Sequence, residues 1–120
     1  MRNTGKFFNG SSRPTISAHH AAVRQMRCCV TRRYPVTLHH VHGGSVTEEY
    51  PQLMRGKAQK TSDWLVIPVV AELHVGRHGI DGAMTVQDWE AAFGRQVDHL
   101  REVSEHVGYD VIGFAMEELR

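Results

Sequence analysis

The distribution of apolar and polar residues along the chain predicts two short β-strands separated by a long polar segment. Residues 36–41 have high β propensity and lie between a proline and a glycine pair, both of which interrupt regular structure. Residues 64–70 form a continuous apolar run, typical of a buried strand, and we expect Pro68 to end it. The intervening residues 45–62 are polar and lack a clear period, which predicts a long loop.

Helical spacing of apolar residues predicts helices on both sides of these strands. A weak apolar face indicates a helix over 17–27, and a short helical turn over 71–78 follows the second strand. Thr85 has the character of an N-cap, and we expect the helix that it begins to end at Gly94. A second helix follows and is expected to stop at Gly108. The pattern as a whole predicts a small α+β fold.

The length of 120 residues indicates one domain with a modest core, to which a bound metal can add stability. We expect residues 1–16, which are basic and rich in small polar residues, to form a flexible arm, and residues 17–120 to form the domain. No apolar run approaches the roughly 20 residues that a membrane span requires. Cys28 and Cys29 are neighbours and are expected to be packed, reduced thiols, which favours the cytoplasm.

The formal net charge of +1 does not by itself indicate a nucleic-acid-binding protein. Its distribution is uneven, because residues 1–33 contain seven arginines and lysines and no acidic residue. Such a segment can lie along a phosphate backbone. A solubilising segment with no ligand is an equally good interpretation of the charge alone.

Histidines form two groups, each next to a predicted strand. His39, His40 and His42 lie at the end of the first strand, and His74 and His78 follow the second. Imidazole is the commonest protein ligand of transition metals and a frequent general base near neutral pH. Since His74 and His78 are four residues apart, they face the same side of a helical turn. The two segments therefore predict the two halves of one metal site.

One geometric condition applies to the adjacent pair His39 and His40. Successive residues of a regular strand point to opposite faces, so both rings can serve one ion only if the strand ends or bulges there. The glycine pair that follows favours an early end of the strand.

The order of these segments resembles the ββα-metal, or HNH, nuclease motif. More closely, it resembles the phage recombination-enhancement family, which are small RecA-dependent HNH-type DNA nucleases of phages and prophages. The resemblance covers about residues 26–108 and rests on Cys28, the run 35–41 with its histidine pair, Gly43-Gly44, the run 60–68, His74 and the run 79–82.

The resemblance implies a role for each matching residue. It implies that His39 is a metal ligand on the first strand, that His40 is the general base that activates water, and that His74 is a ligand on the short helix. For the third ligand, His78 and Asp81 both remain open. The implied cofactor is one divalent metal ion, Zn²⁺, Mg²⁺ or Mn²⁺. The implied partners are DNA and a RecA-type recombinase filament, in a bacterial host cell.

The chain also departs from that family. Relatives carry two pairs of cysteines, whereas this chain has two cysteines in all, Cys28 and Cys29. A four-cysteine zinc site therefore cannot form. The middle residue of the HNH motif, an asparagine in relatives, has no clear counterpart, and Ser62 or Asp63 stands nearest. These losses keep open a non-catalytic alternative, a metal-stabilised DNA- or protein-binding module with a decayed HNH core.

Several basic residues and one histidine are candidates for contacts with DNA phosphates: Arg32, Arg33, His42, Lys57 and Lys60. For the lysines, which lie between the two halves of the site, a solvated loop is an equally good interpretation.

The remaining histidines are assigned no role. His19 and His20 lie in the first predicted helix without a partner cluster, and we expect them to be exposed. His99 and His106 are expected on the solvent side of the last helix.

Together these interpretations predict a small ββα-metal core with additional C-terminal helices. The expected function is metal-dependent endonucleolytic cleavage of DNA in phage recombination or repair.

Overall fold

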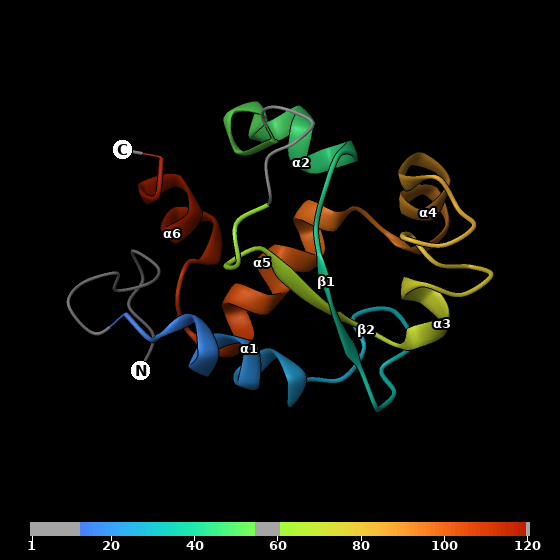
Figure 1. Ribbon diagram of the computed structural model, residues 1–120, viewed down its shortest axis with the longest axis horizontal. Helices are drawn as coiled ribbons and strands as arrows, with labels where there is room; N and C mark the ends of the chain where they lie inside the picture. Colours follow the sequence, from blue (N-terminus) through green and yellow to red (C-terminus); the bar gives the residue numbers. More distant parts are fainter. Residues whose placement is uncertain (1–12, 55–60, 120) are drawn as a thin grey trace.

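The computed structural model describes residues 13–54 and 61–119, and these form an α+β fold (Figure 1). A two-stranded antiparallel sheet is surrounded by six helices in this part of the chain. In chain order the elements are α1 (Ile16–Arg24), β1 (Thr37–His40), α2 (Gly44–Glu49), the 3₁₀ turn η1 (Pro51–Met54), β2 (Val66–Val69), α3 (Ala71–His74), α4 (Val86–Phe93), α5 (Gln96–Val107) and α6 (Val111–Glu117). Within the same ranges, every helix is too short or too polar to cross a lipid bilayer. The predicted arm falls mostly outside the described residues.

The sheet pairs β1 with β2 in a regular antiparallel register. Leu38 lies opposite Pro68, and His40 lies opposite Val66. The expectation that Pro68 ends its strand is therefore wrong. A two-stranded sheet has only edge strands, and proline is tolerated in an edge strand. The backbone of Pro68 faces away from β1, and its carbonyl accepts a hydrogen bond from Cys29 N at 2.9 Å on that side.

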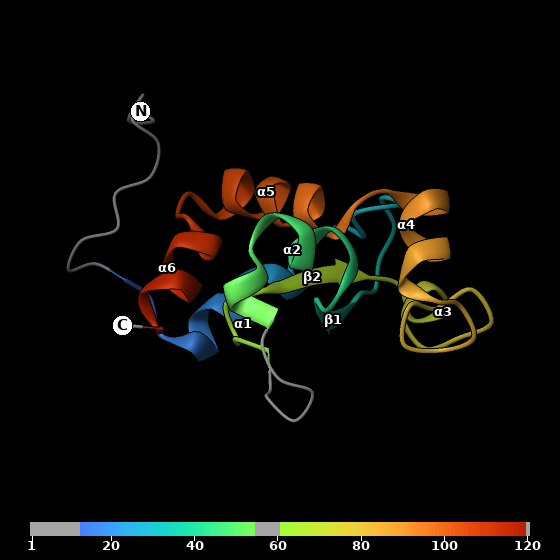
Figure 2. The ribbon, with the colours of Figure 1, turned by 90° about the horizontal axis from the view of Figure 1, so that it is seen from above.

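Helix α5 lies along one face of the sheet, and Figure 2 shows it running above β2. Val97, Leu100 and Val103 recur at helical spacing on its buried face. They belong to the same hydrophobic core as Leu65, which precedes β2, and Ile67 of β2, both of which are fully buried. The predicted helix is confirmed. Burial of such an apolar stripe is what stabilises an amphipathic helix in a globular protein.

The predicted helix ends of the C-terminal half are also confirmed. Thr85 Oγ1 accepts a hydrogen bond from Asp88 N at 3.1 Å and caps α4. Gly94 follows α4, and Gly108 ends α5 in the left-handed conformation, with φ of 88°. The first helix is shorter than the predicted 17–27 and ends at Arg24.

Three elements were missed. The segment 45–62, predicted as a loop, contains the helix α2 and the turn η1, and a separate helix α6 follows α5. Helix α2 depends on a tertiary contact, because both the N–H and the hydroxyl of Ser45 donate to the Glu90 carboxylate, at 3.0 and 2.6 Å. Helix α6 has a local signal, since Asp110 Oδ1 accepts from Gly113 N at 3.0 Å as an N-cap.

Candidate metal centre

Three imidazoles converge on the carboxylate of Asp81. His39 Nδ1 lies 3.2 Å and His74 Nε2 3.0 Å from Asp81 Oδ2, and His42 Nε2 lies 2.7 Å from Oδ1. The four residues come from β1, the segment after it, α3 and the turn after α3. We call His39, His42, His74 and Asp81 the Asp81 cluster.

A tight turn after α3 places Asp81 next to His74. Asp81 N donates to the His74 carbonyl at 2.7 Å, and Ile80 N donates to the Leu73 carbonyl at 3.1 Å. The turn needs glycine at position 79, because a Cβ there would lie 2.6 Å from the His74 carbonyl oxygen. The glycine-rich sequence of this segment therefore folds the chain back onto α3 and brings a carboxylate to the ligand helix.

The hydrogen bonds of Gln96 determine which nitrogen of His39 carries a proton. Gln96 Nε2 donates to the His42 carbonyl at 2.8 Å, and Gln96 Oε1 accepts from His42 N at 3.2 Å, which fixes the orientation of the amide. Gln96 Oε1 lies 2.9 Å from His39 Nε2 and can only accept, so Nε2 is the protonated nitrogen. In neutral His39, Nδ1 then presents a lone pair to Asp81.

The same reasoning applies to His74. The Thr37 hydroxyl donates to the Val69 carbonyl at 2.9 Å, so its oxygen is the acceptor for His74 Nδ1, which lies 2.8 Å away. The lone pair of neutral His74 is therefore on Nε2, which faces Asp81 Oδ2. A metal-ligating histidine commonly donates its other ring N–H to such an outer partner. Two imidazole lone pairs therefore face one carboxylate oxygen, an electron-rich arrangement suited to a proton or a cation.

The protonation states match those of metal ligands. Burial lowers the pKa of His39 below its ordinary value, more than Gln96 and Asp81 raise it, so that the ring is neutral near pH 7. Burial alone would raise the pKa of Asp81, but the hydrogen bond from His42 and the neighbouring histidine charges lower it below its ordinary value. Neutral imidazole and ionised carboxylate are the forms that bind divalent ions.

The donor set and its exposure suit a transition metal with an accessible coordination position. Imidazole nitrogens and a carboxylate oxygen are ligands that Zn²⁺ and related ions accept, and one nitrogen each of His39 and His42 and an oxygen of Asp81 lie within 4.8 Å of one another. The side chain of His39 is fully buried, whereas those of His42 and Asp81 are 45% and 36% exposed. The buried ligand anchors the site, and the exposed ones leave its outer side open to water or substrate.

His40 lies in a second group of residues. Its Nε2 is 2.9 Å from Asp63 Oδ1, and its ring lies edge-on to that of His20. His20 Nε2 in turn lies 2.8 Å from the Asp63 carbonyl. Because the strand register is regular through His40, the two neighbouring histidines point to opposite faces. We call His20, His40 and Asp63 the His40 cluster.

Of the two open choices for the third ligand, the structure brings Asp81 to His39 and His74. His78 is exposed, and among the described residues it forms no hydrogen bond with the Asp81 cluster. His42, expected to contact phosphate, lies in the cluster itself.

Of the candidate DNA-contacting residues that the structure describes, His42 lies in the Asp81 cluster and the two arginines lie on the loop before β1. Arg32 is exposed and pairs with Glu102 at 2.9 Å, and Arg33 is exposed on the same loop. Lys57 and Lys60 lie outside the described residues.

The expectation that His19 is exposed is wrong. It is fully buried, with Nδ1 2.7 Å from the Tyr109 hydroxyl and Nε2 3.1 Å from the Trp64 carbonyl. His20 is half-buried. These two residues attach α1 to the segment before β2, and the sequence contains no local signal for that contact.

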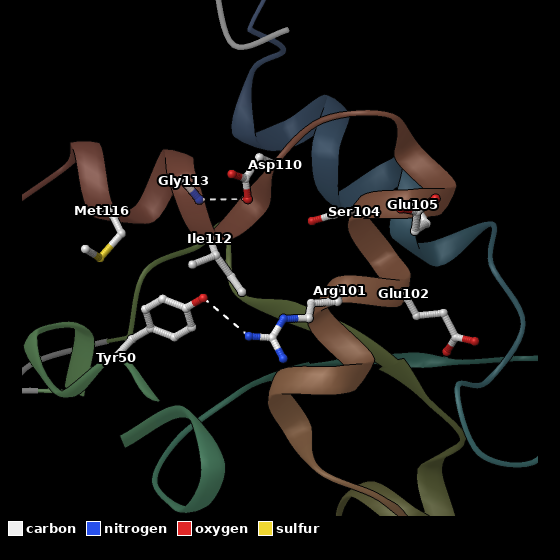
Figure 3. Close-up of a pocket in the computed structure, with 9 residues that line it drawn as sticks. All are labelled: Tyr50, Arg101, Glu102, Ser104, Glu105, Asp110, Ile112, Gly113 and Met116. Atoms are coloured by element: carbon white, nitrogen blue, oxygen red, sulfur yellow. Dashed lines mark hydrogen bonds between the residues drawn. The ribbon is translucent and has the colours of Figure 1, made fainter. Parts of the chain in front are cut away.

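A cavity of about 610 Å³ lies elsewhere, between α5, α6 and Tyr50 (Figure 3). Its walls include Arg101, whose guanidinium lies 3.4 Å from the Tyr50 hydroxyl and 2.6 Å from Glu49. No member of either histidine cluster lines it, so the cavity and the candidate metal centre are separate features.

Comparisons of this chain with models of known protein families, with curated proteins and with solved structures found no match.

Proposed function

We propose that this protein is a metal-dependent nuclease that hydrolyses DNA phosphodiester bonds, with β1, β2 and α3 as a ββα-metal core. The observation that carries the proposal is the convergence of two imidazole lone pairs, from His39 and His74, on the carboxylate of Asp81. His42 completes the donor set from the exposed side. A bound divalent ion supplies Lewis acidity for a phosphate oxygen and for the leaving oxygen.

In this proposal, His40 is the general base. Its Nε2–H donates to Asp63 Oδ1, so the lone pair is on Nδ1, where it can accept a proton from the attacking water. The carboxylate also stabilises the imidazolium that this transfer forms. Because His40 is the last residue of β1, the scissile phosphate must lie at that end of the strand to reach both His40 and the Asp81 cluster.

A second candidate function is a metal-stabilised DNA- or protein-binding module without catalysis. The specific observation in its favour is that His39 and His40 point to opposite faces of the sheet. In such a module the ion holds the fold together and His40 has no water to activate. Chelation then unfolds the protein, and no metal elicits cleavage.

The test is a plasmid-nicking assay on metal-analysed protein with Mg²⁺, Mn²⁺ or Zn²⁺, with and without a RecA-type filament on the DNA. We expect His40→Ala to retain bound metal and to lose cleavage by about 10²-fold or more, the usual contribution of a general base. His78→Ala is the matched control, because it removes an exposed imidazole near the site, and it should cleave normally. Equal cleavage by both variants would contradict the assignment of His40, and cleavage by none of the proteins would favour the binding module.

A further inference from the structure

The His40 cluster itself has the composition of a metal site. One nitrogen from each ring and a carboxylate oxygen of Asp63 lie within 4.8 Å of one another. The three residues come from α1, from β1 and from the segment before β2, and all are half-buried. Two nitrogens and one oxygen, partly shielded from water, are a set that borderline transition ions accept.

The separations within the cluster agree with shared coordination. His40 Nε2 and Asp63 Oδ1 are 2.9 Å apart. Two ligands that each lie about 2.0–2.2 Å from one tetrahedral ion are separated by roughly 3.3–3.6 Å. An ion can therefore replace the proton between these two atoms if the side chains move apart by about half an ångström.

The backbone around Asp63 holds His20 in place. The Asp63 carbonyl can only accept, so His20 Nε2 is protonated and Nδ1 has the lone pair. The preceding residue, His19, bonds to the next carbonyl, that of Trp64, at 3.1 Å. His19 and His20 thus form hydrogen bonds with the adjacent carbonyls of Trp64 and Asp63, and these two bonds attach α1 to the segment before β2. The cluster is preorganised rather than assembled from mobile side chains.

We propose that His20, His40 and Asp63 form a second transition-metal site, and that its occupation inhibits cleavage. The site is expected to prefer Zn²⁺ to Mg²⁺, because imidazole ligands suit Zn²⁺ and Mg²⁺ prefers oxygen ligands. An ion held by His40 and Asp63 separates the base from its orienting carboxylate and keeps the ring from accepting a proton. The proposed binding of zinc by the His40 cluster is independent of the proposed nuclease function, whereas the proposed inhibition of cleavage rests on that function.

The binding test uses tag-free, metal-stripped, full-length protein titrated with Zn²⁺ against a chromogenic chelator. The wild type is expected to bind two equivalents, one for each histidine cluster. His20→Ala should lose one of them. His20→Gln should do the same while it keeps a donor for the Asp63 carbonyl, which separates loss of a ligand from loss of folding. His106→Ala, which removes an exposed imidazole at the end of α5, is the matched control and should bind as the wild type does. Wild-type stoichiometry and affinity in both His20 variants would overturn the site.

The inhibition test adds Zn²⁺ to Mg²⁺-supported cleavage and compares each variant with its own zinc-free rate. We expect the His20 variants to need at least about tenfold more zinc for half inhibition, because loss of a ligand costs no less affinity than the 10–100-fold that loss of an outer hydrogen-bond partner typically costs, and we expect His106→Ala to be inhibited as the wild type is. Equal inhibition of all variants would overturn the inhibitory role. If no protein cleaves but the second equivalent still depends on His20, the nuclease proposal fails and the metal site stands.

Discussion

At the scale of single residues, the polar partners of the histidines determine the chemistry of the candidate site. Gln96 and Thr37 each engage one ring nitrogen, at 2.9 and 2.8 Å, and so direct the lone pairs of His39 and His74 towards Asp81. Without these partners, each ring could adopt the other tautomer and donate a hydrogen bond to the carboxylate. The cation-binding character of the cluster therefore depends on residues that are not themselves ligands.

This dependence predicts the effect of Thr37→Val, which keeps the shape of the side chain and removes the acceptor of His74 Nδ1. We expect zinc affinity at the Asp81 cluster to fall about 10–100-fold, the usual effect of losing an outer hydrogen bond to a ligating histidine. Competition with a chelator measures it. Thr47→Val, on the exposed side of α2, makes the same chemical change away from the cluster and should leave zinc affinity unaltered. Equal affinities in the two variants would show that Thr37 does not orient His74.

Part of the site could be predicted from the sequence. The strand and helix signals placed His74 and the pair His39 and His40 in one candidate site, the family resemblance selected His39 as the ligand, and Asp81 was one of two open choices for the third ligand. Thr37 had a signal that could have been used, because it lies two residues before His39 on the same strand face. Gln96 had none, since it is 57 residues from His39 and carries no motif. Partners that meet only through tertiary packing leave no local pattern.

At the scale of secondary-structure elements, predictions succeeded where the signal is local. Helix α5 has its own apolar stripe, and Gly108 gives it a stop. Helix α2 was missed because what holds it is Glu90, which bonds to Ser45 across the fold. Strand β2 was predicted, but Pro68 was wrongly expected to end it. Proline is tolerated there because the sheet has only two strands, and the sequence of one strand does not show how many strands its sheet contains.

The start of α2 gives a matched pair of glycine substitutions. Gly44 and Gly108 both have positive φ, 53° and 88°, which an L-residue adopts at a cost of about 1–2 kcal/mol. A Cβ at Gly44 would also lie 2.5 Å from Glu90 Oε1, whereas one at Gly108 meets no atom within 4 Å. We therefore expect Gly44→Ala to lower the free energy of unfolding more than Gly108→Ala does, in urea titrations of metal-stripped protein. Equal losses would show that Glu90 moves aside freely and does not fix the start of α2.

At the scale of the whole molecule, one small sheet separates two histidine clusters. The regular register of β1 sends His39 to one face and His40 to the other, and α1, α3 and α5 supply the partners on each side. A ligand that binds only the folded state stabilises it by mass action. If the two clusters bind metal as proposed, binding is coupled to the stability of the whole fold, and stability measured with and without a chelator tests this.

His19 makes the stability of the metal-free fold depend on pH. Burial, with a smaller contribution from the neighbouring His20, lowers the pKa of His19 from 6.5 to about 4, against the raising effect of the hydrogen bond to the Trp64 carbonyl. Between pH 6.5 and about 4 the unfolded chain therefore binds a proton at this position that the folded chain does not. The resulting contribution to the free energy of unfolding is fully present above pH 6.5 and is lost as the pH falls through this window, by up to about 3 kcal/mol.

Urea denaturation at several pH values, with a chelator present, measures this dependence. His19→Gln keeps a donor for the Trp64 carbonyl but cannot titrate, so it should be less stable than the wild type at pH 7.5 and lose less stability on acidification. His106→Ala is the control, because it removes a histidine that is exposed in the fold. Because the wild type and His19→Gln differ at this residue alone, the difference between their two curves isolates the buried ring. Parallel curves would mean that His19 takes up a proton in the folded state as readily as in the unfolded one, and that the contact between α1 and Trp64 tolerates an imidazolium.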